Sequence, residues 1–153
     1  MKRTVLFASI ALLFLAGCSH KEDDKIYHSF ADHIWYRWNI LQFEVPVEKG
    51  DQPFNVVFFT YHTMDYPYDS LSFNMVMTAP SGEERIRECT IRIRDQKGQF
   101  TGTFLGDSCE RKIILSREMV FTKEGFLRIE LENLVPRPRT PGLCGVGIRL
   151  EKP

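Results

Sequence analysis

Histidine, cysteine and acidic side chains have the most specific chemistry in this sequence, and their spacing limits what they can do. His28, Asp32 and His33 are close enough in the chain to suggest a metal site. Only residues of like parity share one face of an extended strand, so these three side chains are not expected to converge. Structural zinc sites typically use cysteine pairs with CxxC spacing. No such pair occurs among the cysteines beyond residue 80. The sequence therefore predicts no metal ligands.

Motifs of catalysis are also absent from the sequence. There is no GxSxG elbow, no HExxH pair and no Walker loop. The stretch 142–147 is rich in glycine, but it leads into a strand, whereas phosphate binding needs the N-terminus of a helix. Carboxylates fall mainly on the polar faces of predicted strands, so no pair is marked out for glycoside hydrolysis. We expect a protein that is not an enzyme and that has no catalytic residues and no cofactor.

Cys18 is the cysteine with the clearest chemical role. The apolar run 5–16 follows two basic residues and is too short to span a bilayer as a helix, which needs roughly 20 residues. This pattern predicts a secretory signal peptide over residues 1–17. The segment Leu15-Ala16-Gly17-Cys18 resembles the bacterial lipobox, in which the cysteine thiol is acylated and the chain is cut before it. Two or more acyl chains anchor a protein stably, so we expect lipid on Cys18 to hold the protein at a membrane.

The segment after this cysteine is hydrophilic. Ser19–Lys25 contains no apolar residue, so residues 18–25 are expected to form a solvated tether and residues 26–153 one folded domain. Its acidic cluster resembles the surface-export signal of Bacteroidota lipoproteins, with a plain spacer as the alternative. Beyond residue 17 the formal charge is −2, from 18 basic and 20 acidic residues. This balance gives no reason to expect nucleic acid binding.

Cys89, Cys109 and Cys144 remain in the expected domain. The envelope is oxidising, so one disulfide is possible, and the odd number leaves one thiol over. We prefer three mostly buried thiols, with a Cys89–Cys109 bridge as the alternative.

From residue 26 onward the apolar residues recur with period two, which is typical of strands. The alternation predicts strands within 41–47, 54–61, 71–77, 89–94, 100–105, 113–121, 127–131 and 146–150. The strand 54–61 is apolar on both faces, as expected for a central strand covered on each side. Ile86 has the opposite parity to Cys89, which predicts a bulge near Arg87 and Glu88. Eight or nine short strands predict an all-β fold, a single antiparallel β-sandwich with a jelly-roll arrangement preferred.

Aromatic and basic residues in the connections are candidates for contact with a partner or ligand. Three tyrosines surround Pro67 in one connection, and two arginines alternate with prolines in the segment 136–142, which we interpret as an extended surface loop. The candidate contact residues are Trp35, Tyr61, Tyr66, Tyr68, Arg137 and Arg139. Tyrosine favours interfaces with proteins and can stack on sugars. Alternatively, the rings cover the end of the sandwich.

These residues resemble the GldH-type gliding-motility lipoproteins of Bacteroidota. The most specific segments are Tyr66-Pro67-Tyr68 and the glycine-rich ending that starts at Pro141-Gly142-Leu143. The lipobox, Trp38 with Phe43, Pro80-Ser81-Gly82 and Gly98–Gly102 add to the resemblance. The chain is similar to a divergent member, because Phe100 stands where tryptophan is usual.

The resemblance implies a non-enzymatic lipoprotein, anchored in the outer membrane on its periplasmic or surface face. It implies a role in gliding motility and in the linked protein-secretion machinery, through contacts with other envelope proteins. A surface module that binds glycan is the alternative suggested by the sandwich and its aromatic residues. An envelope hydrolase is a third hypothesis, for which a cleft with paired polar residues is required.

Overall fold

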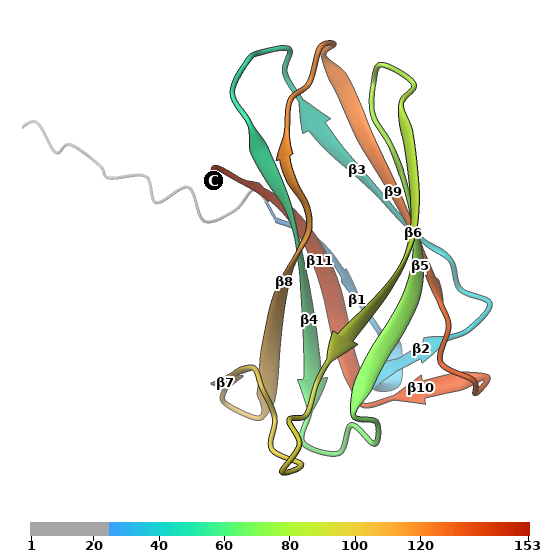
Figure 1. Cartoon of the computed structure of the whole chain (residues 1–153). Coiled ribbons are helices and arrows are strands. Elements are labelled where there is room, and N and C mark those ends of the chain that lie inside the picture. The colour runs from blue at the N-terminus through green and yellow to red at the C-terminus, as the bar shows by residue number, and fades with distance from the viewer. Residues whose placement is uncertain (1–24) are drawn as a thin grey trace, which may run out of the picture.

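The computed structural model describes residues 25–153, and the chain there is almost entirely extended (Figure 1). Cys18, the predicted signal peptide and the tether up to Asp24 lie outside the described residues. The elements are β1 (Ile26–Ser29), η1 (Ala31–His33, a 3-10 turn), β2 (Ile34–Tyr36), β3 (Leu41–Val47), β4 (Phe54–Thr63), β5 (Ser70–Thr78), β6 (Glu84–Arg92), β7 (Thr103–Leu105), β8 (Ser108–Met119), β9 (Gly125–Asn133), β10 (Arg139–Pro141) and β11 (Leu143–Glu151). Each strand predicted from alternation has a counterpart, whereas β1, β2 and β10 were not predicted.

The long strands form two antiparallel sheets that pack face to face (Figure 1). The five-stranded sheet has the order β1-β11-β4-β8-β7, and the four-stranded sheet has the order β3-β9-β5-β6. Along the chain, the long strands pass repeatedly from one sheet to the other, so most neighbours in a sheet are distant in sequence. This order is that of a jelly roll, and the predicted β-sandwich with jelly-roll topology is confirmed. A separate two-stranded ribbon joins β2 and β10.

The core lies between the sheets and follows the predicted alternation. Every second residue of β3 is buried, and β5 repeats the pattern along its length. Phe58 of the five-stranded sheet meets Phe73 of the four-stranded sheet, with their ring centroids 5.0 Å apart. Each large apolar side chain that is fully buried contributes about 1.5–3 kcal/mol. Packing across the two sheets is therefore the main force that holds this fold together.

The bulge predicted in β6 is absent. β6 pairs with β5 in one continuous register from Glu84 to Arg92, and Ile86 lies opposite Val76 with 70% of its surface exposed. Arg85 and Arg87 are on the same face of β6 as the buried Cys89, and both extend across to β8. Arg87 donates to the Leu115 carbonyl, and Arg85 donates to the Ser116 hydroxyl. The open seam between the sheets is thus bridged by guanidinium groups, so an apolar residue at position 86 can face outward. The prediction was wrong because it assumed that isoleucine must face the core.

The three cysteines of the described chain are not bonded to one another. Cys89 and Cys109 are buried, and Cys144 is partly buried. Burial raises the pKa of the Cys109 and Cys144 thiols, which keeps them protonated and weakly reactive. The preferred prediction of three mostly buried thiols is confirmed for these residues, and the alternative bridge is not formed.

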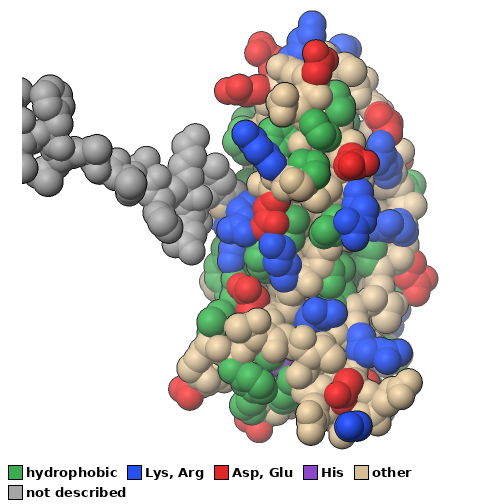
Figure 2. Space-filling view, turned by 60° about the vertical axis from the view of Figure 1, so that its left-hand side comes forward, with side chains coloured by type: hydrophobic (Ala, Val, Ile, Leu, Met, Phe, Trp, Pro, Cys, Tyr) green, Lys and Arg blue, Asp and Glu red, His purple; other side chains and the backbone are tan. Residues whose placement is uncertain are grey.

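β4 is covered on both faces, as predicted. Phe59 points away from the core, and three cations lie over its ring: Lys25 at 4.2 Å, Arg149 at 4.9 Å and Lys112 at 5.7 Å from the centroid. Figure 2 shows this side of the molecule, where basic side chains mixed with acidic ones gather over the middle of the face. Aliphatic stems of lysine and arginine cover apolar surface while their charged ends remain in water. This arrangement explains how an outward aromatic residue is buried.

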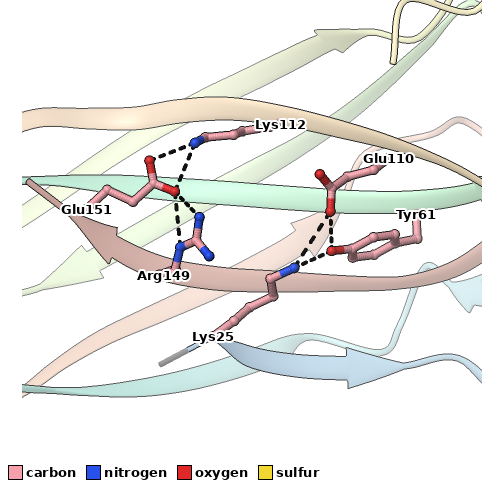
Figure 3. Close-up of polar contacts among 6 residues, drawn as sticks. All are labelled: Lys25, Tyr61, Glu110, Lys112, Arg149 and Glu151. Atoms are coloured by element: carbon pink, nitrogen blue, oxygen red, sulfur yellow. Dashed lines mark hydrogen bonds and ion pairs between the residues drawn. The ribbon is translucent and has the colours of Figure 1, made fainter. Parts of the chain in front are cut away.

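The cations over Phe59 have acidic partners (Figure 3). Lys25 donates to the Tyr61 hydroxyl, Tyr61 donates to the Glu110 carboxylate, and Lys25 and Glu110 are 3.7 Å apart. Glu151 accepts from Lys112 at 2.7 Å and from Arg149 at 3.0 Å. We name Lys25, Phe59, Tyr61, Glu110, Lys112, Arg149 and Glu151 the Phe59 cluster. Lys25 was expected in the solvated tether, but it packs on the sheet because an aromatic surface and a carboxylate lie within reach.

Candidate functional site

The ribbon of β2 and β10 lies at one end of the sandwich (Figure 1). Its register pairs Ile34 with Pro141, Trp35 with Thr140, and Tyr36 with Arg139. Side chains alternate between the faces of a strand, and the ribbon follows this rule. Trp35 and Thr140 are fully buried, whereas Arg139 and Pro141 are exposed on the other face. The ribbon therefore closes one end of the core and presents its second face to solvent.

A buried asparagine fixes the ribbon to the four-stranded sheet. The Asn133 side chain, at the end of β9, donates to the Thr140 hydroxyl at 2.8 Å and to the Trp35 carbonyl at 3.3 Å. Its carbonyl oxygen accepts from the Val135 amide at 2.9 Å. Trp35 also stacks on Phe30, with ring centroids 5.6 Å apart. Because a buried amide is costly unless it is bonded, these contacts specify one position for the ribbon.

The loop that contains Tyr66 packs directly on Gly142. The φ angle of Gly142 is +81°, and a Cβ atom there would lie 2.8 Å from the Tyr66 Cα atom. Glycine is required for both reasons, since other residues rarely adopt this angle and none could fit. The Thr63 amide donates to the Gly142 carbonyl at 2.8 Å, and the Tyr66 hydroxyl donates to the Ser70 carbonyl at 3.0 Å. Tyr66 is thus a core residue.

Arg94 holds the same loop from its other side. Its guanidinium donates to the Tyr66 carbonyl at 2.8 Å and to the Tyr68 carbonyl at 3.1 Å, and it lies 4.3 Å from the centroid of the Phe100 ring. The amides of Ile93 and Arg94 donate to the Asp69 carbonyl at 2.8 and 3.0 Å. Three segments that carry the family resemblance, 66–68, 98–102 and 141–143, therefore meet at one end of the molecule. The contacts among these segments fix the position of the loop.

His62 lies beneath the loop. Its ring is fully buried, with centroids 4.7 Å from Phe100 and 5.6 Å from Tyr66, and its Nδ1 atom lies 3.0 Å from the Thr63 carbonyl oxygen. Burial lowers the pKa of His62, the bond to Thr63 opposes this, and the nearby Arg94 charge lowers it further. The imidazole is therefore neutral at pH 7 and contributes packing and one hydrogen bond.

The ribbon and this loop line an open pocket of about 440 Å³. Its lining residues are Ile34, Tyr68, Arg137, Pro138, Arg139 and Pro141, and we name it the arginine pocket. Arg137 and Arg139 are exposed, and neither is paired with an acidic side chain of residues 25–153. Trp38 lies just after β2, 71% exposed, with its ring 4.9 Å from that of Tyr36. Aromatic, apolar and cationic groups are thus presented together on a fixed backbone.

The structure divides the six candidate contact residues into three groups. Tyr68, Arg137 and Arg139 come together in the arginine pocket. Trp35 and Tyr66 are fully buried, so their assignment as contact residues was wrong: both rings complete the core at the end of the sandwich. Tyr61 belongs to the Phe59 cluster on the outer face of the five-stranded sheet, where its hydroxyl bonds with Lys25 and Glu110.

Several residues of the site were not among the candidates. Ile34, Pro138 and Pro141 line the pocket, and Arg94 holds its loop. The parity of Ile34 and Tyr36 around Trp35 carried a usable signal, because a buried Trp35 places its neighbours on the outer face. No signal marked Arg94, since its partners are backbone carbonyls of a distant loop. In the described part of the chain, no group of three or more His, Cys, Asp or Glu side chains is placed to hold a metal ion.

Comparison with known proteins identifies one family. The family model described as GldH lipoprotein matches residues 24–150, which is most of the chain and reaches every element of the fold. No curated protein and no solved structure matches the chain. Among residues 25–153, no helix is both long enough and apolar enough to cross a membrane.

Proposed function

Because the chain belongs to the GldH lipoprotein family, which is associated with gliding motility, we propose that it is a non-enzymatic component of an outer-membrane assembly. This assembly serves gliding and the linked protein-secretion machinery. Lipid on Cys18 anchors the protein in the outer membrane, and the sandwich contacts another envelope protein. The arginine pocket, with Tyr36 and Trp38 beside it, is the contact surface.

The composition and rigidity of this surface support the proposal. Tyrosine, tryptophan and arginine are the residues most enriched at the energetic centres of protein interfaces. They stand here on a ribbon fixed by Asn133 and on a loop fixed by Arg94 and Gly142. A surface already held in its binding conformation loses little entropy when a partner binds. The single observation that carries the proposal is that Tyr68, Arg137 and Arg139 come together in one pocket, with the exposed Trp38 close by in the chain after β2.

The lining of the pocket favours a protein partner over a neutral sugar. Neutral sugars are recognised through hydroxyl groups, which need side chains that accept as well as donate hydrogen bonds. The lining contains two guanidinium groups, which only donate, and one phenol, but no carboxylate or side-chain amide. The glycan hypothesis therefore has weaker support at this site.

The test is recovery of the full-length lipidated protein from native membranes after mild cross-linking, with mass spectrometry of the proteins that accompany it. We expect other envelope proteins in near-stoichiometric amounts. Recovery of the protein alone, or with polysaccharide only, would contradict the proposed function.

A matched pair of variants tests the contact surface. Trp38→Ala is expected to lower recovery of the partner, whereas Phe126→Ala is expected to leave it unchanged, because Phe126 is a half-exposed aromatic residue of β9 in another part of the fold. Equal recovery of the partner with both variants would show that Trp38 and the neighbouring ribbon are not part of the interface. It would not contradict the existence of the assembly.

A further inference from the structure

We infer that the arginine pocket binds an acidic segment of the partner protein, with carboxylate side chains paired to Arg137 and Arg139. This inference rests on the proposed function and adds the chemistry of the partner. A guanidinium group offers a planar fork of donors that matches a carboxylate, and such pairs are stronger than hydrogen bonds between neutral groups. The pocket holds two of these forks and no carboxylate of its own.

The contrast with other arginines of the described chain supports this choice. Arg128 pairs with Glu44 at 3.1 Å, and Arg85 pairs with Glu83 at 2.8 Å. Arg87 and Arg94 use their guanidinium groups on backbone carbonyls. Arg137 and Arg139 make no such bond to the described residues, and the same holds for Arg37, Arg92 and Arg117. What sets the pair Arg137 and Arg139 apart is that both belong to one short segment and line the same pocket.

The backbone of this segment is held in place before any partner binds. Prolines at positions 136, 138 and 141 restrict φ, and the ribbon register fixes Arg139 opposite Tyr36. The Arg37 amide donates to the Pro138 carbonyl at 3.0 Å, which ties the segment to the end of β2. Little backbone entropy remains to be lost when the arginines are engaged.

The size and lining of the pocket favour a chain segment over a single small anion. Its volume of about 440 Å³ is larger than a single small anion needs, and it is open to solvent, so a chain segment can enter it. Ile34, Tyr68 and the prolines give it apolar walls, which an apolar side chain can contact. An acidic residue together with an apolar neighbour would use both the arginines and these walls.

The experiment maps the bound segment directly. The full-length lipidated chain carries Trp38→p-benzoylphenylalanine, is cross-linked by light in native membranes, and the joined peptide is sequenced by mass spectrometry. We expect a protein segment in which acidic residues outnumber basic ones. A neutral or basic segment would overturn the inference, and so would attachment to polysaccharide or lipid alone.

Charge reversal tests whether the contact depends on the charge of the two arginines or only on the shape of the pocket. Arg137→Glu with Arg139→Glu is expected to lower the cross-linking yield at least about tenfold, since like charges are brought together in the contact. The matched control is Arg117→Glu with Lys123→Glu, two exposed basic residues elsewhere with the same total charge change, and its yield should equal that of the parent chain. Equal yields from both double variants would overturn the inference.

The outcomes also separate this inference from the proposed function. If an envelope assembly is recovered and the charge reversal at Arg137 and Arg139 does not affect it, the proposed function is supported and the inferred acidic partner segment is contradicted. Absence of any assembly would overturn both. Restoration of the yield by basic residues in the mapped segment of the partner would identify the pairing itself. Thermal unfolding of each variant checks that the sandwich remains intact.

Discussion

The Phe59 cluster and the arginine pocket combine the same kinds of side chain in opposite ways. Around Phe59, three cations share two carboxylates and two aromatic rings, so the charges are satisfied within the domain. In the arginine pocket, two cations share aromatic and apolar walls but have no acidic partner in the described chain. The first arrangement covers a sheet, whereas the second leaves binding capacity unused.

This difference shows why charge and aromatic content alone do not locate a binding site. Both regions would attract attention in a search for aromatic and basic residues. What separates them is the set of partners that the fold supplies to each charge. Exposed ion pairs contribute little stability, typically up to about 1 kcal/mol, so a charge left without a partner costs the free protein little and remains available for binding.

The largest expected effect concerns the base of the loop, on which the comparison depends. Tyr66→Ala should lower the free energy of unfolding by about 3–5 kcal/mol, because it empties a fully buried aromatic site and removes the bond to the Ser70 carbonyl. Urea unfolding followed by tryptophan fluorescence measures this change. Trp38→Ala is the control, and it should cost less than about 0.5 kcal/mol because the ring is mostly exposed. Similar costs for the two variants would show that Tyr66 is a surface residue after all.

The next effect concerns the clamp on the other side of the loop. Arg94→Ala should cost about 2 kcal/mol, because two backbone carbonyls lose a charged donor. Hydrogen exchange should become faster at the amides of residues 93 and 94, whose acceptor is the Asp69 carbonyl. Arg94→Lys should recover only part of the loss, since an ammonium group lacks the fork that reaches both carbonyls. Unchanged exchange in Arg94→Ala would mean that the loop is rigid without this residue.

The fold could be predicted from the sequence because its signal is local and periodic. Alternation in β3, β5 and β9 marks both the strand and its buried face, and the mixed apolar pattern of β4 marks a strand covered twice. The ribbon escaped prediction because β2 and β10 have three residues each, too few for a period to be visible, and because proline suggested a loop. Their pairing is fixed by Asn133, whose partners are in other segments of the chain.

The candidate site could be predicted only in part, for a related reason. A tyrosine beside a proline in a loop is compatible with two roles: an exposed residue that contacts a partner, and a buried residue that completes the core. Tyr66 and Tyr68 show both outcomes two residues apart, since one ring is enclosed over Gly142 and the other lines the pocket. The deciding factor is a close approach between segments about 75 positions apart in the sequence. No property of either segment alone contains that information.

A smaller effect is expected from pH, through His62 below the loop. Burial lowers the pKa of His62 in the folded state, so the unfolded chain binds more protons as pH falls below about 6.5. Stability from this group is therefore complete above about pH 6.5 and is lost as pH falls towards the folded-state pKa. Urea unfolding at pH 7.5 and 5.5 measures the loss, and His62→Gln should reduce it. A pH dependence that is the same in His62→Gln would assign it to other groups.

The smallest expected change in stability comes from a pair of variants that distinguishes the Phe59 cluster from the arginine pocket most directly. Lys25→Ala should cost about 0.5–1 kcal/mol, because it removes a partly exposed ion pair and a cation over the Phe59 ring. It should leave partner recovery from cross-linked membranes unchanged. Arg139→Ala should do the opposite, with stability unchanged within about 0.5 kcal/mol and partner recovery reduced. If Lys25→Ala also reduced recovery, the Phe59 cluster would be part of the interface, and satisfied charges would not be a criterion for excluding a surface from binding.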